Sequence, residues 1–134
     1  MSFSINRNGY TTKGLSIKRL FADAAKSDDI DSYGCNCLIG AGHMHELLKA
    51  QNFSADKYIQ ILPNSGYPQI LRGRTIYSDG VAWFAEQLER IAHMGVNILG
   101  GCCGTTPTHM AALRTLIDNH TPSPRHRKPS MSVT

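Results

Sequence analysis

The amino-acid sequence predicts an α/β fold built on a parallel sheet. Short runs rich in strand-forming residues alternate along the chain with longer stretches whose apolar residues recur at helical spacing. The order of these segments is β-α-β-α-β-α-β-α. Strands that alternate with helices pair in parallel through right-handed crossovers, so the prediction is four βα units in one layer of sheet covered by helices.

The first half of the chain supplies two of these units. Residues 3–5 are the first predicted strand, and a helix follows in which Ser16 is the N-cap. Its buried stripe recurs at i, i+3, i+4 and i+7 and consists of Ile17, Leu20, Phe21 and Ala24. Residues 32–37 are the second strand. We expect a glycine loop at residues 40–42 and then a helix through Met44, Leu47 and Leu48.

The second half supplies the other two units. Residues 58–62 form the third strand, which a turn at residues 63–66 ends, and residues 67–78 are predicted as a long loop. A helix spans residues 80–93 and ends near Gly95, and residues 96–99 are the fourth strand. The last helix begins with Thr106 as N-cap and Pro107 at its first position.

The positions of two cysteines make the fold class more specific. Cys37 and Cys102 both follow strands and are about 65 positions apart, while two βα units of a TIM barrel occupy roughly 60 residues. This spacing places both thiols on the C-terminal rim of such a barrel, two strands apart, where barrel enzymes build their active sites. Four βα units are half of a (β/α)8 barrel.

The segment Gly100-Gly101-Cys102-Cys103-Gly104 is the strongest functional signal. Two adjacent thiols between glycines can turn both sulfurs toward one point, because glycine has no Cβ to obstruct the approach. With Cys37, they make three protein ligands and one open position, which is the pattern of a catalytic zinc site. Two other interpretations stay open: small buried residues in a tight turn, and a strained disulfide between the neighbours.

Other polar residues near the predicted rim give weaker signals. Cys35 would point the same way as Cys37 in a regular strand, but an offset of roughly 6–7 Å predicts a place in the core instead of a fourth ligand. His43 and His109 lie near helix starts and can approach the rim, or lie at the surface or behind the ligands. The glycine loop at residues 40–42 lacks both phosphate-loop motifs, which disfavours a phosphate site.

Composition and charge exclude several classes of protein. The formal charge of +4 comes largely from a basic, proline-flanked tail at residues 121–134, which we expect to be disordered and solvated. The tail lacks the aromatic residues of single-strand binders, so no nucleic-acid partner is predicted. No signal peptide or membrane-spanning stretch is evident, which predicts a cytoplasmic protein with reduced thiols and no membrane partner.

The motifs resemble those of the homocysteine S-methyltransferase family. The match covers the glycine-cysteine segment continued through Thr105, Thr106 and Pro107, the pair Asn36-Cys37, and the loop at residues 63–68. Arg72-Gly73-Arg74 followed by Tyr77 is similar to the methionine-synthase-like branch and its folate-reductase-fused relatives. The resemblance extends from about residue 3 to residue 117 and implies the C-terminal half of a TIM barrel, with residues 1–120 as a partial homocysteine-binding domain.

The resemblance also implies a chemistry. In such proteins zinc is held by three cysteines, here Cys37, Cys102 and Cys103, and Asn64 takes the fourth position before substrate arrives. Zinc keeps homocysteine as a thiolate, which attacks an activated methyl group and gives methionine. The resemblance leaves the methyl donor open, because methyltetrahydrofolate, a methyl-corrinoid, S-methylmethionine and betaine all serve members of the family. Homocysteine-binding acidic residues belong to the other half of the barrel, so a separate N-terminal half or a second copy is the expected partner.

Three hypotheses about function follow from these residues. The first is a zinc-dependent homocysteine S-methyltransferase in truncated or split form. The second is a zinc-binding half-barrel fragment without catalytic turnover. The third, a redox or iron–sulfur protein, is disfavoured because the sequence has no C-x-x-C spacing.

Overall fold

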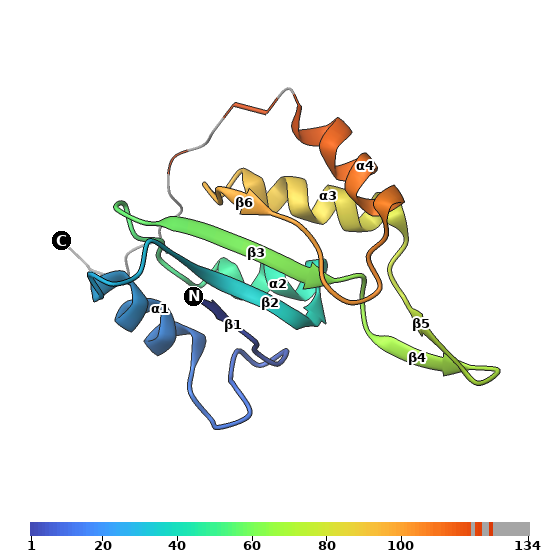
Figure 1. Cartoon of the computed structure of the whole chain (residues 1–134), viewed down its shortest axis with the longest axis horizontal. Coiled ribbons are helices and arrows are strands. Elements are labelled where there is room, and N and C mark those ends of the chain that lie inside the picture. The colour runs from blue at the N-terminus through green and yellow to red at the C-terminus, as the bar shows by residue number, and fades with distance from the viewer. Residues whose placement is uncertain (119, 122–123, 125–134) are drawn as a thin grey trace.

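The computed structural model describes residues 1–118, 120, 121 and 124. The tail expected to be disordered, residues 121–134, falls almost entirely outside this described part. The described residues fold as a single sheet with helices against it and a separate hairpin that projects from the body (Figure 1). None of the helices in the described part is long and apolar enough to span a membrane.

The main sheet confirms the predicted parallel α/β architecture. It has four parallel strands in the order β1-β2-β3-β6, with bounds Ser2–Phe3, Ser32–Gly40, Tyr58–Asn64 and Ile98–Leu99. The two long strands, β2 and β3, lie in the middle and pair from Ser32 with Tyr58 to Asn36 with Leu62. Their carboxyl ends therefore lie side by side, which is where the predicted site residues fall.

Four helices follow the strands in the predicted order. They are α1 (Ile17–Lys26), α2 (Ala41–Leu48), α3 (Val81–Ala92) and α4 (Pro107–Ile117). Both predicted N-caps are confirmed: Ser16 Oγ accepts the Arg19 N–H, and Thr106 Oγ1 accepts the His109 N–H. Local capping chemistry thus sets where α1 and α4 begin.

The core lies between the sheet and its helices. The large side chains that are fully buried there include Tyr33 of β2, Ile59 and Ile61 of β3, and Phe84 and Leu88 of α3. Alternate residues of β3 face the other way and stay partly exposed or exposed, and no helix lies in front of β2 or β3 in Figure 1. The sheet is therefore covered by helices on one face.

Two segments differ from the sequence-based expectations. The predicted loop at residues 67–78 contains an antiparallel hairpin, β4 (Pro68–Leu71) and β5 (Arg74–Tyr77). Arg72 and Gly73 both have positive φ, as a two-residue hairpin turn requires. The glycine loop expected at residues 40–42 does not form either, because β2 runs to Gly40 and α2 begins at the next residue.

A bulge near the end of β2 re-aims the chain just where the site begins. Asn36 pairs with Leu62 and Gly40 pairs with Asn64, so β2 holds two more residues than β3 over this stretch. Cys37 and Leu38 within the bulge have φ of 62° and 60°, a strained conformation for residues other than glycine. The bulge breaks the regular side-chain alternation of the strand at Cys37.

Candidate metal centre

Three cysteine sulfurs gather at the carboxyl ends of the central strands. The Sγ of Cys37 lies 3.5 Å from that of Cys103, and the Cys102 and Cys103 sulfurs are 3.9 Å apart. All three lie within 4.8 Å of one another, and within the described part of the chain they form the one such cluster of potential metal ligands. Tetrahedral zinc with bonds of 2.3 Å places sulfurs about 3.8 Å apart, so this donor set fits zinc.

The backbone around Cys102 and Cys103 is held against the end of β3. The Cys102 N–H donates to the Pro63 carbonyl at 2.9 Å, and the Cys103 carbonyl accepts the Ser65 N–H at 3.0 Å. The segment thus continues the β3–β6 pairing beyond the last residue of β6. This pairing fixes both neighbouring thiols relative to the strand that also borders Cys37.

Asn64, the predicted fourth ligand, is buried at the last position of β3. Its Oδ1 accepts the backbone N–H of Cys103 at 3.1 Å. The side chain therefore positions the cysteine segment directly, a role that sequence reasoning did not foresee. The same oxygen has a second lone pair, so this hydrogen bond is compatible with metal binding. The ligand role of Asn64 stays a prediction.

Asn64→Ala is expected to weaken zinc binding by about 10- to 100-fold, as loss of a group that orients metal ligands does. It also leaves the Cys103 N–H without its acceptor, so the metal-free protein should lose about 1–2 kcal/mol of unfolding free energy. Zinc competition titrations and urea unfolding of the metal-free protein measure the two effects. An unchanged metal-free stability would argue that Asn64 acts as a ligand alone.

Glycines bracket the two cysteines for steric reasons within the protein. A Cβ on Gly101 would lie 2.5 Å from the Thr105 side chain, whose Oγ1 donates to the Cys102 carbonyl at 2.6 Å. Gly104 has φ of +81°, and a Cβ there would lie 2.2 Å from the ring of Tyr77. Glycine is therefore required at both positions, as predicted. The groups that leave no room for a Cβ are Thr105 of the turn and Tyr77 of the hairpin, and not a bound ion.

Cys35 does not join the cluster. It is fully buried in β2 opposite Ile61, and burial raises the pKa of its thiol to about 12. Cys35 and Cys37 do not point the same way, because the bulge begins after Asn36 and separates the regular strand at Cys35 from Cys37. The placement of Cys35 in the core agrees with the expectation.

The other thiols differ in their ease of ionisation. Burial opposes ionisation of Cys37, but hydrogen bonds from the Leu38 backbone and the neighbouring thiols outweigh it, so its pKa is lowered. Burial raises the pKa of Cys102 to about 11, and its contact with Cys37 adds to this. In the absence of metal, Cys37 therefore loses its proton more readily than Cys102 does.

This order predicts the alkylation pattern of the metal-free protein. Because the thiolate is the nucleophile, Cys37 should react with iodoacetamide before Cys102 near neutral pH, and Cys35 should stay unmodified until the protein unfolds. Mass spectrometry of the cysteine peptides over time gives the order. Modification of Cys35 in folded protein, or of Cys102 ahead of Cys37, would contradict this arrangement of thiols.

His109 supports the centre from behind and does not lie at the surface. It is buried, its Nδ1 accepts the Thr106 N–H at 3.1 Å, and its Nε2 lies 2.9 Å from Ser65 Oγ. The ring therefore carries its proton on Nε2 and donates to Ser65, whose hydroxyl donates to the Asp79 carbonyl. The Ser65 N–H also donates to the Cys103 carbonyl, so His109 stabilises the site indirectly, through Ser65.

His43 lies elsewhere, at the start of α2. Its Nδ1 is hydrogen-bonded to the hydroxyl of Tyr67, and it lines a cavity between α2 and α3. None of the three clustered cysteines is among the residues described as lining that cavity. His43 is thus not part of the sulfur cluster.

A parallel sheet with three thiols at its carboxyl edge defines an α/β protein with a candidate thiolate metal centre. The homocysteine S-methyltransferase family model matches residues 1–117, and the chain belongs to this family. The resemblance inferred from its motifs is thereby confirmed.

Two methionine synthases are among its relatives. The protein of Mycobacterium tuberculosis is 33% identical over 91 residues, which are 67% of this chain and 8% of the relative. That of Mycobacterium leprae is 35% identical over 82 residues, or 60% of this chain and 7% of the relative. The chain therefore spans less than a tenth of the length of these relatives.

Solved structures of the homocysteine methyltransferase MmuM from Escherichia coli share the fold. The metallated form matches 85% of this chain and 34% of its own with a TM-score of 0.60 and 23% identity. The oxidized form matches 84% of this chain and 35% of its own with a TM-score of 0.61. At this identity the likeness shows the fold alone.

Proposed function

We propose that this chain is the C-terminal half of a zinc-dependent homocysteine S-methyltransferase, with Cys37, Cys102 and Cys103 as the metal ligands. The observation that carries the proposal is the group of three sulfurs within 4.8 Å of one another at the carboxyl edge of a parallel sheet. When bound, zinc supplies a Lewis acid that keeps a substrate thiol ionised at neutral pH. Asn64 is the proposed fourth ligand before substrate binds.

The chain's own residues hold the three thiols in place and leave one side open. Asn64 and Ser65 fix the backbone of Cys103, and the bulge in β2 turns Cys37 toward it. Cys103 is exposed, so a thiol substrate has access from solvent. Three fixed donors with access from one side suit a metal that must exchange its fourth ligand, as in catalytic sites.

We infer that residues 1–120 are four βα units of a half-barrel. The sheet exposes one face, and β1 and β6 lie at its edges within the described residues, which supports pairing with another half. The partner is a separate N-terminal half or a second copy of this chain. That partner would supply the contacts to the amino group of homocysteine, and the cytoplasm, where thiols stay reduced, is the proposed location.

The methyl donor is methyltetrahydrofolate, a methyl-corrinoid or S-methylmethionine. The alternative function is a zinc-binding half-barrel without turnover. The same four strands and thiols support both, so they differ only in whether a reacting pocket is completed by a partner. Zinc binding is common to the two, and methionine formation separates them.

The test begins with the metal content of the purified chain. We expect one zinc per chain. X-ray absorption should show that the number of sulfur atoms bound to the zinc rises by one when homocysteine is added. The chain is then assayed for methionine formation with each donor, while light scattering reports its oligomeric state. Zinc and homocysteine binding without methionine favours the half-barrel without turnover, whereas absence of zinc binding refutes both functions.

A further inference from the structure

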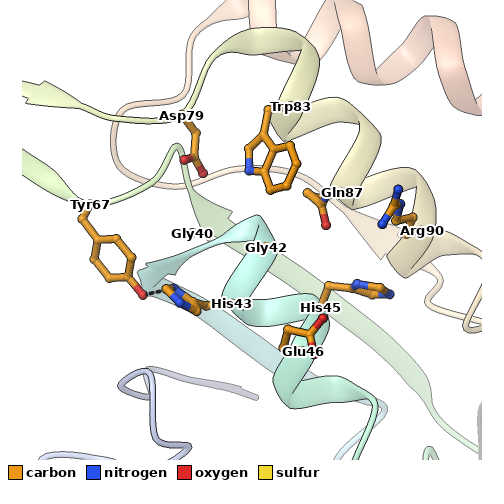
Figure 2. Close-up of a pocket in the computed structure, with 10 residues that line it drawn as sticks. All are labelled: Gly40, Gly42, His43, His45, Glu46, Tyr67, Asp79, Trp83, Gln87 and Arg90. Atoms are coloured by element: carbon orange, nitrogen blue, oxygen red, sulfur yellow. Dashed lines mark hydrogen bonds between the residues drawn. The ribbon is translucent and has the colours of Figure 1, made fainter.

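A cavity of about 470 Å³ lies between α2 and α3, apart from the sulfur cluster. His43 and Glu46 line it from α2, while Trp83, Gln87 and Arg90 line it from α3 (Figure 2). Its volume is within the range of small-molecule sites, about 300–1,000 Å³. Nothing in the proposed methyl transfer uses these side chains.

Gln87 is the first indication that the cavity takes a ligand. The side chain is only 3% exposed, and Figure 2 shows its amide pointing into the space between the two helices. Within the described part of the chain this amide makes no hydrogen bond. Among the described residues no side-chain nitrogen or oxygen is both fully buried and unpaired, so solvent in the cavity reaches this amide. A ligand amide that replaces the solvent would satisfy its donor and acceptor together.

The two ends of the cavity carry opposite charges. Asp79 lies at one end, with its carboxylate packed so closely on Gly40 and Gly66 that a Cβ on either would come within 2.9 Å of it. Arg90 lies at the other end (Figure 2). Neither side chain forms a hydrogen bond or ion pair with the described residues. Both charges are therefore available to groups of a ligand.

Trp83 forms an apolar wall between these ends. The indole is 49% exposed, and Gly42 of α2 leaves room for it, since a Cβ there would lie 3.3 Å from the ring. Trp83, Gln87 and Arg90 follow one another at i, i+4 and i+7 and so share one face of α3. That face spans about 10 Å along the helix axis.

We propose that this cavity binds an elongated zwitterion with an amide in its middle, of which an extended tripeptide is the simplest. Three extended residues span about 10 Å, which is the length of the α3 face from Trp83 to Arg90 and does not include Asp79. The ammonium group pairs with Asp79, the central amide bonds Gln87, and the carboxylate takes a bidentate pair with Arg90. An apolar central side chain packs on Trp83. A compact anion or a compact amino acid fills only one end of this arrangement.

Trp83 is the only tryptophan of the sequence, so its fluorescence reports on this cavity alone. The probe is the tripeptide alanyl-leucyl-alanine, with its N-acetylated and C-amidated forms as matched controls. We expect a saturable change in emission with the free tripeptide and at least about tenfold weaker binding of each blocked form. Because the cavity does not include the clustered cysteines, the titration gives the same result with zinc-loaded and metal-free protein.

Substitutions assign each end of the peptide. Asp79→Asn should weaken the free tripeptide about tenfold and leave the N-acetylated form unchanged, while Arg90→Gln should weaken the free tripeptide and leave the C-amidated form unchanged. Glu86→Gln, an exposed change on α3 outside the cavity, should leave all three affinities unchanged. Circular dichroism checks that each variant is folded.

Binding of a peptide and binding of a simple anion give different results in these titrations. Equal affinity for the free and both blocked tripeptides would overturn it, as would the absence of a saturable change at millimolar peptide. Displacement of the tripeptide by inorganic phosphate at equal concentration would show an anion site at Arg90 alone and would also overturn it. The variant Gln87→Leu tests the hydrogen bonds to the central amide. Because all three peptides contain this amide, the variant should weaken the binding of all three alike.

Discussion

Cys102→Ala is expected to lower the zinc affinity of this chain by more than about 100-fold. Loss of a group that merely orients a metal ligand costs 10- to 100-fold, and Cys102 is proposed as a ligand itself. Its sulfur lies 3.9 Å from that of Cys103, within the spacing of tetrahedral zinc. Competition with a chromophoric chelator measures the affinity, and metal analysis after dialysis measures retention.

Cys35→Ala is the matched control, because it also removes one thiol, and it does so two residues from the proposed ligand Cys37. Cys35 lies in the core opposite Ile61, so its loss leaves a small cavity and costs on the order of 1–2 kcal/mol of unfolding free energy. Zinc affinity should stay at the wild-type value. Zinc loss in folded Cys35→Ala, or full zinc binding in Cys102→Ala, would overturn the ligand assignment.

The regular elements were predictable because their signals are local. Ser16 begins α1 and Thr106 with Pro107 begins α4 through contacts within a few residues of the helix start. The alternation of strand and helix then predicts a parallel sheet without any knowledge of long-range contacts. The cysteine spacing extends this argument to the site, since strands of known length and direction bring Cys37 and Cys102 to one edge.

The hairpin β4–β5 escaped prediction because its strands are exposed. Every residue from Pro68 to Ile76 is exposed, so neither strand shows the alternation of buried and exposed positions that marks a half-buried strand. Without strand periodicity on either side, the run Arg72-Gly73-Arg74 indicated only a loop. Its position next to the site is a tertiary property: Tyr77 at its end packs on Gly104.

The contacts that orient the thiols are also beyond local sequence patterns. The bulge in β2 depends on how its residues match β3 across the sheet, and nothing in the types of Cys37 and Leu38 favours positive φ. Asn64 and Cys103 are distant in sequence, and so are Ser65 and His109. The sequence pattern predicts which residues would bind a metal, whereas the sheet determines how they are held.

Gly34→Ala is expected to destabilise the folded chain severely. Gly34 lies in β2 opposite Gln60 of β3, and a Cβ there would lie 1.6 Å from the Gln60 carbonyl oxygen and 2.6 Å from its carbon. Backbone atoms cannot rotate away as a side chain does, so relief requires the two central strands to separate. We expect a loss of at least about 4 kcal/mol, a large part of the roughly 5–15 kcal/mol available to such a domain.

Urea unfolding followed by circular dichroism measures this loss, and Gly80→Ala serves as its control. Gly80 is the N-cap of α3 with φ of −72°, and an added Cβ meets nothing within 4 Å, so the cost should stay below about 1 kcal/mol. Because β2 and β3 carry Cys37 and Asn64 at their ends, Gly34→Ala should also lose zinc binding. A Gly34→Ala protein with an unchanged urea midpoint would mean that β2 and β3 do not pair in this register. The geometry of the sulfur cluster, which depends on that pairing, would then be wrong as well.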